Sequence, residues 1–258
     1  MFTLPVIYGS NTVMNQGGRT VLSNQEPLPA ITDISRYCGS YSIKTLLSDL
    51  LQESTTTKRR FDRLIKAEKE LFERIPDAGF AELGEIHTKL TDIELERFQL
   101  SSSVAPLHKQ CTEYRDLLAK HTVELLEAEF VHDGYGAPPC HYTLISMGSD
   151  GRQEQTLITD QDYLIVYDDT GGEGADAWFE HFGTRLVDRL EEVGFARCTG
   201  GIMTSNPTWR GSYSQWRKRL FAIVRYEVED FAKNMMDLIV LSDARYVAGD
   251  QVLGERLI

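Results

Sequence analysis

One stretch in the second half of the chain constrains its fold and chemistry more than any other part. Residues 147–154 read MGSDGRQE, and residues 159–162 read TDQD. Apolar and β-prone residues precede and follow this stretch, and glycine at 148 marks a turn. We predict a strand over 141–147, a short helix or turn over 151–157 and a second strand over 160–167. Two carboxylates then lie eleven residues after a Gly-Ser turn.

Asp160 and Asp162 are the candidate metal ligands. Side chains two residues apart in an extended strand project from the same face, which places Gln161 on the opposite face. Two carboxylates that lie close together in a partly buried site repel each other, and a divalent cation removes the repulsion. Mg²⁺, or Mn²⁺ in its place, prefers oxygen ligands and substrate phosphates. We therefore predict that Asp160 and Asp162 bind metal and are catalytic.

The Gly-Ser turn is the candidate phosphate site. Gly148 lets the backbone approach a phosphate closely, and Ser149 offers both an N–H and a hydroxyl. Arg152 adds a guanidinium whose geometry suits phosphate oxygens. Gly148, Ser149 and Arg152 are therefore predicted to bind a nucleotide.

The alternative is that the acidic pair belongs to a solvated turn, which is the usual place of an isolated Asp-x-Asp. A lone Gly-Ser is a weaker signal still. The combination of strand, Gly-Ser turn, Arg-x-Glu, Thr-Asp-x-Asp and a second apolar strand is much more specific. It favours a nucleotide site.

At these residues the chain resembles the polymerase-beta-type nucleotidyltransferase superfamily. The pattern is similar to that of the N-terminal domain of protein-PII uridylyltransferase and of the adenylyltransferase that modifies glutamine synthetase. It is more similar still to a bacterial family of sequence-assigned nucleotidyltransferases, described as signal-transduction proteins and often fused to CBS or cyclic-nucleotide-binding domains. Later blocks of that family resemble residues 200–210 and 242–245, so the resemblance covers about residues 105–258.

The resemblance implies an enzyme that transfers an NMP from an NTP to a hydroxyl of a protein or small-molecule acceptor, with Mg²⁺ and in signal transduction. Regulatory domains or partners are implied as well. A catalytically silent module that senses nucleotides is a second hypothesis, because such relatives are joined to sensor domains. A third is an interaction protein that binds its partner through the helices expected at 43–132.

The superfamily uses a third carboxylate on a later strand, and the resemblance assigns it to Asp243. This residue follows the apolar run at 238–241, which we expect to be a strand. Asp237 borders the same run, and a period of two would place both acids on one face. Spacing alone leaves the choice open, and the Asp-x-Arg match favours Asp243 as catalytic residue and metal ligand.

The block at 200–210 has two interpretations. Gly200-Gly201 and Asn206-Pro207 are turn formers, which fits a structural loop with Trp209 as its packing anchor. In the functional interpretation, Asn206 and Arg210 contact the nucleotide or its acceptor.

The net charge of the chain limits the class of its binding partners, and its cysteines indicate the cellular compartment. The 258-residue chain has a net charge of −12, whereas nucleic-acid backbones attract basic surfaces. We therefore expect an NTP and a protein or small-molecule acceptor rather than nucleic acid. Cys38, Cys111, Cys140 and Cys198 lack zinc-site spacing, which indicates free thiols in a reducing cytoplasm. Neither a signal peptide nor an apolar run of ~20 residues is visible, so we expect no membrane association.

The organisation along the chain predicts an α+β fold. Residues 1–42 form an irregular N-terminal arm without a period. Residues 43–132 show helical periodicity, with breaks near 76–79 and 101–103. Residues 133–258 are expected to form a polymerase-beta-like nucleotidyltransferase domain, a small mixed sheet flanked by helices that lie on one face. Helices are expected at 175–193 and 216–231, with a short strand at 195–199.

Overall fold

The computed structural model describes residues 13–14, 20–21, 42–225 and 231–257. The chain divides into two compact units, Met1–Thr56 and Thr57–Ile258. In the first unit, β1 (Val13–Met14) pairs antiparallel with β2 (Thr20–Val21). The rest of the expected arm, except Ser42, lies outside the described residues, as does Cys38.

Three long helices occupy the region of helical periodicity: α1 (Ile43–Phe72), α2 (Phe80–Ser101) and α3 (Val104–His132). Helix α1 begins after Ser42, whose Oγ accepts the Thr45 N–H at 3.2 Å, an N-terminal capping contact. A 3₁₀ turn, η2 (Ile75–Asp77), follows α1. Ser102 adopts a left-handed conformation with φ of 50° and ends α2. Both predicted helix breaks are confirmed.

The second unit contains a four-stranded mixed sheet in the order β5-β4-β3-β6. Its strands are β3 (Tyr142–Ser146), β4 (Tyr163–Tyr167), β5 (Arg210–Ser212) and β6 (Arg245–Gly249). Strand β3 is antiparallel to both β4 and β6, and β4 is parallel to β5. The predicted α+β class with a small mixed sheet is confirmed.

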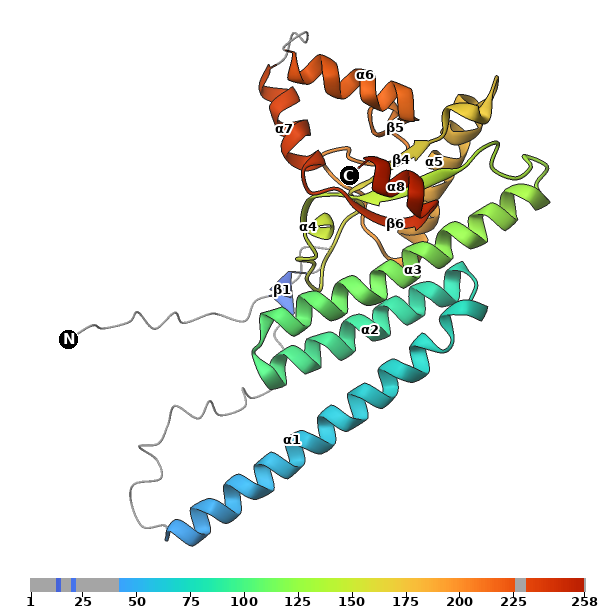
Figure 1. Cartoon of the computed structure of the whole chain (residues 1–258). Coiled ribbons are helices and arrows are strands. Elements are labelled where there is room, and N and C mark those ends of the chain that lie inside the picture. The colour runs from blue at the N-terminus through green and yellow to red at the C-terminus, as the bar shows by residue number, and fades with distance from the viewer. Residues whose placement is uncertain (1–12, 15–19, 22–41, 226–230, 258) are drawn as a thin grey trace. The chain divides into compact units, whose positions relative to one another are not determined.

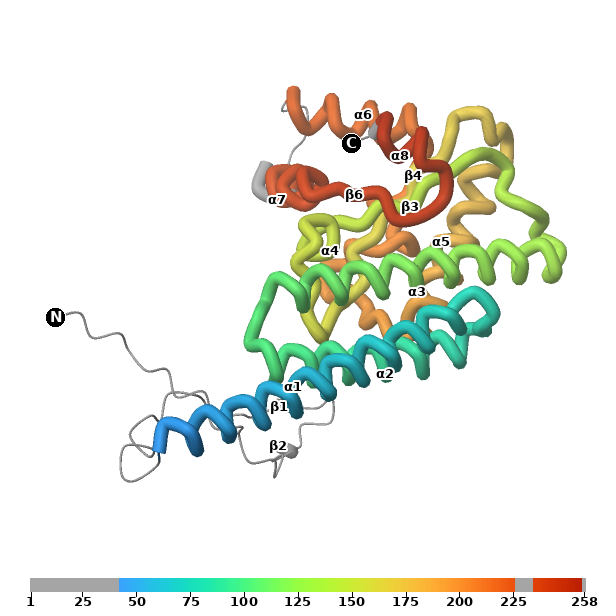
Figure 2. Tube along the Cα trace, turned by 60° about the horizontal axis from the view of Figure 1, so that its bottom comes forward, coloured from blue at the N-terminus to red at the C-terminus, as the bar shows by residue number. Residues whose placement is uncertain are grey.

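Helices cover both faces of this sheet, whereas we expected them on one (Figures 1 and 2). Leu144 and Ile165 pack with residues of α2, α3 and α5 (Ala175–Val193) in one apolar core. Ile145 and Leu164 point the other way, into a second core that contains Trp216 of α6 (Tyr213–Val224). Every residue of β3 and β4 is buried, as two covered faces require.

The apolar run at 238–241 is not a strand. It ends helix α7 (Phe231–Leu241), and the strand of this region is β6. A short apolar run does not distinguish a strand from a helix by periodicity, which explains the error. The helix expected at 216–231 is α6, which ends at Val224.

Three further short elements lie in the described part of the second unit. They are η3 (Asp169–Gly171), η4 (Pro207–Trp209) and α8 (Gln251–Leu257). The strand expected at 195–199 is reduced to a single parallel bridge between Ala196 and Asp160. No helix in the described ranges combines the length and the hydropathy that crossing a bilayer requires.

Candidate active site

The turn between β3 and β4 brings the two halves of the predicted motif together. Strand β3 leads into a one-turn helix, α4 (Gly148–Gly151), and Ser146 pairs with Tyr163 at the start of β4. The Met147 N–H donates to the Asp162 carbonyl at 2.9 Å. Gly148 has a φ of 60°, and a Cβ there would lie 3.0 Å from Asp162 Oδ2. Glycine at 148 therefore permits both the turn and the close approach to the Asp162 carboxylate.

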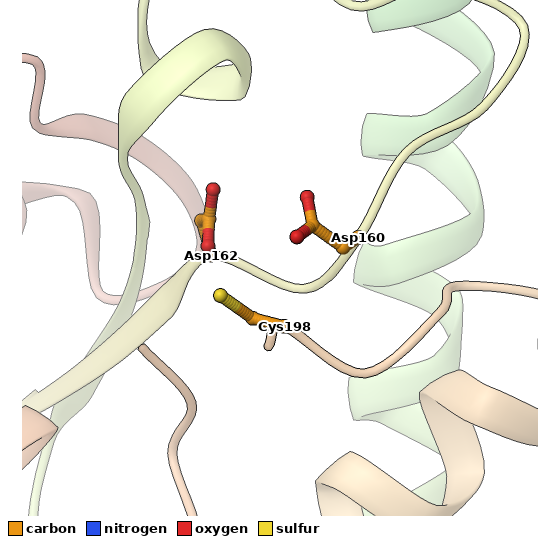
Figure 3. A group of neighbouring side chains, drawn as sticks. All are labelled: Asp160, Asp162 and Cys198. Atoms are coloured by element: carbon orange, nitrogen blue, oxygen red, sulfur yellow. The ribbon is translucent and has the colours of Figure 1, made fainter. Parts of the chain in front are cut away.

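Asp160 and Asp162 lie just before β4 with their carboxylates close together (Figure 3). Gln161 is buried, and its Nε2 donates to the carbonyls of Val187 at 3.1 Å and Phe195 at 3.0 Å. These bonds fasten the middle residue to α5 and to the segment after it. The alternation that was predicted from the spacing is confirmed, and it directs both carboxylates to the same side.

Cys198 is the third member of this group, and the sequence did not identify it. One carboxylate oxygen of Asp160, one of Asp162 and the Cys198 Sγ all lie within 4.8 Å of one another. The thiol hydrogen-bonds to Asp162; burial, followed by this bond, raises the pKa of Cys198 to about 11. Cys198 has no Cys-x-x-Cys partner, no nearby His and no zinc-type spacing that would mark it as a ligand in the sequence. Its position two residues before Gly200, in the segment that resembles the family, is the only sequence signal for a role.

The electrostatics of the group favour a cation. Burial raises the pKa of Asp162, the charge of Asp160 raises it further, and the Cys198 thiol opposes the shift. Asp162 Oδ1 is buried without a hydrogen-bond partner among the described residues. A buried carboxylate oxygen without a partner costs free energy, and a divalent ion with oxygen preference fits this position. Asp160 and Asp162 are the residues that could hold it.

Arg152 and Asp243 are paired with each other beside α4. The Arg152 Nη1 donates to Asp243 Oδ2, and its Nε donates to Glu154 Oε2 at 2.8 Å. Asp243 lies in the turn between α7 and β6, and its carbonyl is so close to Gly151 that a Cβ there would lie 1.9 Å away. Asp243 is not in the described group of three ligand atoms, and Asp237 lies within α7.

Asn206 and Arg210 both bond to the backbone of their own loop. Asn206 Oδ1 accepts the Thr208 N–H at 3.0 Å, and its Nδ2 donates to the Gly201 carbonyl at 3.0 Å. Arg210 is buried, and its Nη1 donates to the Thr204 carbonyl at 2.7 Å. Either side chain would have to exchange these bonds to contact a nucleotide, so their binding role stays a prediction.

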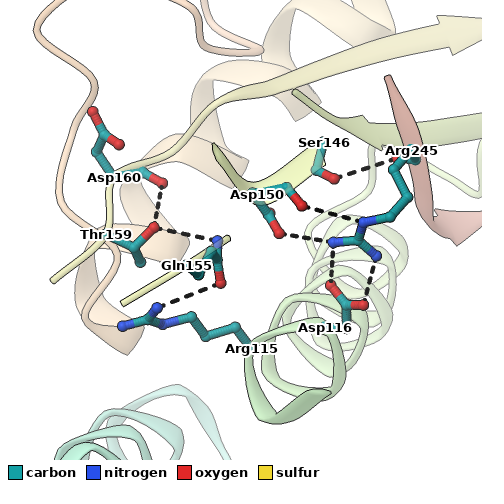
Figure 4. A network of polar contacts seen from close by, with 8 residues as sticks. All are labelled: Arg115, Asp116, Ser146, Asp150, Gln155, Thr159, Asp160 and Arg245. Atoms are coloured by element: carbon teal, nitrogen blue, oxygen red, sulfur yellow. Dashed lines mark hydrogen bonds and ion pairs between the residues drawn. The ribbon is translucent and has the colours of Figure 1, made fainter. Parts of the chain in front are cut away.

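Charged side chains, of which Asp150 is buried and Arg245 and Asp116 are half-buried, fix α4 to the surrounding elements (Figure 4). Arg245 of β6 donates to both oxygens of Asp116 on α3, at 2.7 and 3.0 Å, and to Asp150 Oδ1 at 2.7 Å. Burial raises the pKa of Asp150 to about 6, although Arg245 opposes the shift. Through Arg245, Asp150 therefore joins α4 to β6 at the sheet edge and to α3.

A second polar chain supports the loop that carries Asp160. Arg115 of α3 is buried and donates to the Thr156 and Leu157 carbonyls and to Gln155 Oε1. Gln155 Nε2 donates in turn to Thr159 Oγ1 at 3.2 Å. Arg115 therefore reaches from the helical region to the residue before Asp160.

Two clefts in the described structure lie away from the acidic group. The larger, of about 660 Å³, includes Cys140, Tyr142 and Asp250 in its lining; the smaller, of about 260 Å³, includes Asp168 and Asp176. We place the candidate site at Asp160 and Asp162 instead, because only that group presents three ligand atoms close together within the described residues.

A small mixed sheet with paired carboxylates beside a Gly-Ser turn is the arrangement that the resemblance to nucleotidyltransferases predicts. The profile of the family described as "Putative nucleotidyltransferase DUF294" matches residues 88–230. This is more than half of the chain, and the chain belongs to this family, as the resemblance predicted. Neither a curated protein nor a solved structure matches the chain.

Proposed function

We propose that the protein transfers an NMP from an NTP to a hydroxyl of a protein or small-molecule acceptor and releases pyrophosphate. The observation that carries the proposal is the convergence of the Asp160 and Asp162 carboxylates beside Gly148, with Asp162 Oδ1 lacking a partner in the described structure. Mg²⁺, or Mn²⁺, would be held by these two carboxylates, where it would neutralise phosphate charge and activate the attacking oxygen.

Gly148, Ser149 and Arg152 are the proposed phosphate contacts. Ser149 is half-buried on α4, next to the glycine that touches Asp162. The Arg152 side chain is exposed at the surface, so incoming ligands can reach its guanidinium. Phosphate oxygens would compete with Asp243 and Glu154 for its guanidinium, which suits such bidentate contacts.

Asp243 is the proposed third carboxylate, with Asp237 as the alternative. In the structure Arg152 holds the Asp243 side chain. If a nucleotide draws Arg152 toward its phosphates, Asp243 is released. It would then accept the proton of the acceptor hydroxyl as the hydroxyl oxygen attacks the α-phosphorus and the bond to pyrophosphate breaks. Ligand entry and completion of the acidic triad are thereby coupled.

The class of acceptor molecule is proposed from the net charge of the chain. A net charge of −12 disfavours a nucleic-acid template, so we propose a protein or small molecule that is modified in signal transduction in the cytoplasm, as by a PII-type uridylyltransferase. Asn206 and Arg210 are proposed to adjoin the nucleotide or acceptor. Regulatory domains or partners would control the reaction.

Transfer of the label from α-labelled NTP tests the proposal. Each of the four NTPs is supplied with Mg²⁺ and a fractionated extract as the source of acceptors, and label and pyrophosphate are followed. Asp160→Asn and Asp162→Asn should abolish transfer, whereas Asp168→Asn, at the other end of β4, should not. Undiminished transfer by both of the first two variants would refute the assignment.

A silent nucleotide-sensing module is the second candidate function. It is favoured by the Arg152–Asp243 ion pair and by the place of Asp243 outside the three-atom group. Calorimetry with a non-hydrolysable NTP distinguishes the two functions. Mg²⁺-dependent binding that requires Asp160, without pyrophosphate release from any NTP, would support the sensor.

A further inference from the structure

The thiol of Cys198 gives the acidic group a ligand of a different chemical kind. Its Sγ lies within 4.8 Å of a carboxylate oxygen of Asp160 and of Asp162, and Figure 3 shows the three side chains directed toward one another. Asp162 Oδ1 is independently left buried without a hydrogen-bond partner in the described structure. The site therefore contains two carboxylates as hard oxygen donors and one soft sulfur donor, and one oxygen of the Asp162 carboxylate lacks a hydrogen-bond partner within the described residues.

Hard and soft ligands select different ions. Mg²⁺ binds carboxylate oxygens and does not use sulfur, whereas Zn²⁺ and other thiophilic cations bind thiolates strongly. We propose that Cys198 is the third ligand of an Asp160–Asp162–Cys198 site for a thiophilic divalent cation such as Zn²⁺ or Cd²⁺, which displaces the working ion and inhibits the protein. The inhibitory part rests on the proposed function, but the binding of the cation does not.

The geometry is compatible with a three-ligand site. Ligands bonded to Zn²⁺ at about 2.0–2.3 Å in a tetrahedron lie roughly 3.5 Å apart. Three atoms that already lie within 4.8 Å of one another need to close by at most about 1.3 Å per pair to reach that arrangement. Three protein ligands leave the fourth position for water or substrate, as in other open zinc sites.

Binding of the cation to Cys198 releases one proton and needs no further reactant. The S–H bond of Cys198 breaks, the sulfur electron pair forms the bond to the cation, and the proton leaves to solvent. The hydrogen bond from the thiol to Asp162 is lost at the same time, and the Asp162 carboxylate becomes a ligand instead. No change of oxidation state is involved. Mg²⁺ cannot replace the proton in this way, because it offers too little affinity for sulfur.

Cys198 differs in this respect from the other described cysteines. Cys111 is buried within the apolar core of α2 and α3. Cys140 lies in the larger cleft, and its thiol donates a hydrogen bond to the Asp168 carbonyl at 3.2 Å. Neither belongs to a group of three ligand atoms within the described ranges. Cys140→Ser is therefore a matched control for Cys198→Ser.

Spectroscopy on the full chain tests the site without reference to activity. Co²⁺ added to the chain should produce a thiolate-to-cobalt charge-transfer band in the near ultraviolet. The band should persist in Cys140→Ser and vanish in Cys198→Ser. The Kd for Cd²⁺ should rise at least about tenfold in Cys198→Ser, since even loss of an outer-shell partner costs a metal site this much. No band in the wild type, or a band that survives in Cys198→Ser, overturns the proposal.

A measurement on the unmodified chain covers the case in which the serine variant does not fold. The ¹¹³Cd resonance of the Cd²⁺-loaded protein reports whether sulfur is bound. A shift typical of mixed oxygen and sulfur ligation supports the site, and a shift typical of oxygen alone overturns it. If NTP transfer is never detected but the sulfur-ligated resonance is present, the proposed function fails while this site stands.

Discussion

Replacing Asp162 by Asn should stabilise the protein when no metal is present. The Asp160 and Asp162 carboxylates lie within 4.8 Å of each other, and burial together with the Asp160 charge raises the pKa of Asp162. The folded state therefore contains a repulsion that the unfolded chain relaxes. Asn removes one charge, and its Oδ1 can still accept the hydrogen bond of the Cys198 thiol.

The size of the expected stabilisation follows from the distance between the Asp160 and Asp162 carboxylates. Two unit charges no more than 4.8 Å apart repel by at least about 3 kcal/mol at an effective dielectric constant of about 20. Imperfect placement of the new amide offsets part of this gain, so we expect a net stabilisation of about 1–3 kcal/mol at pH 7.5. A gain of about 2 kcal/mol corresponds to a rise in Tm of roughly 4–8 °C for a chain of this size.

The stability difference between Asp162→Asn and the wild type should increase with pH. Because the pKa of Asp162 is raised in the folded state, its ionisation costs stability as the pH rises through that value. The wild type and Asp162→Asn should therefore be most alike below the ordinary carboxyl pKa of about 4 and diverge above it.

Thermal unfolding in EDTA and then in Mg²⁺ is the assay. Mg²⁺ at a hundred times its Kd should stabilise the wild type by about 2.7 kcal/mol and leave Asp162→Asn unchanged. Asp92→Asn, an exposed position on α2, is the control and should shift stability by less than about 0.5 kcal/mol. If Asp162→Asn is destabilised in EDTA, or still gains stability from Mg²⁺, the carboxylates are not a strained cation site.

Three further predictions concern the elements that support the site. Burial raises the pKa of Glu94 to about 7, against the opposing charge of Arg97, so the wild type loses stability as the pH rises from about 4.5 through 7. Glu94→Gln should gain up to about 3 kcal/mol on the wild type between pH 4 and pH 8 in urea unfolding; a pH-independent difference would contradict this. Gly151→Ala places a Cβ 1.9 Å from the Asp243 carbonyl and should cost about 2–3 kcal/mol in the same assay; wild-type stability would show that this contact is absent. Arg115→Met removes the donor to two loop carbonyls and should cost about 2–3 kcal/mol and speed proteolysis at 153–159; unchanged cleavage would exclude its anchoring role.

The elements that could be predicted are those with local signals. The helices α1, α2 and α3 follow from apolar residues at helical spacing and from the breaks at 76–79 and 101–103. Strands β3 and β4 follow from apolar runs on either side of a glycine turn. In each case the residues that determine the element lie within it or next to it. The positions of Asp160 and Asp162 on one side belong to this class.

The prediction of a strand at 238–241 was wrong because this short apolar run lacks such a local signal. Residues 238–241 are uniformly apolar, and nothing in four residues separates a period of 2 from one of 3.6. The structure resolves the ambiguity through packing, since Val240 and Leu241 lie against the core that contains Trp216. The position of helices on both faces was missed for a related reason. A uniformly apolar strand such as β4 indicates two covered faces, and this signal is present in the sequence.

Contacts between distant residues were beyond the reach of sequence patterns. Arg245 and Asp116 are 129 positions apart, and Arg245 and Asp150 are 95 apart. The spacing of ionisable residues along the chain carries no information about such pairs. The same limit applies to Cys198, which reaches the acidic group only because the segment after α5 lies beside Asp160, through the Ala196 bridge.

The strained carboxylates persist because uncharged bonds hold the backbone that carries them. The Gln161 N–H donates to the Ala196 carbonyl at 2.9 Å, its side chain donates to α5, and the Asp162 carbonyl accepts from Met147. None of these bonds weakens when the two carboxylates repel. If the acidic side chains alone set the local conformation, they would turn apart into solvent. A site fixed by its backbone can instead lower the repulsion by taking up a proton or a cation, and this would be the physical origin of the proposed cation affinity.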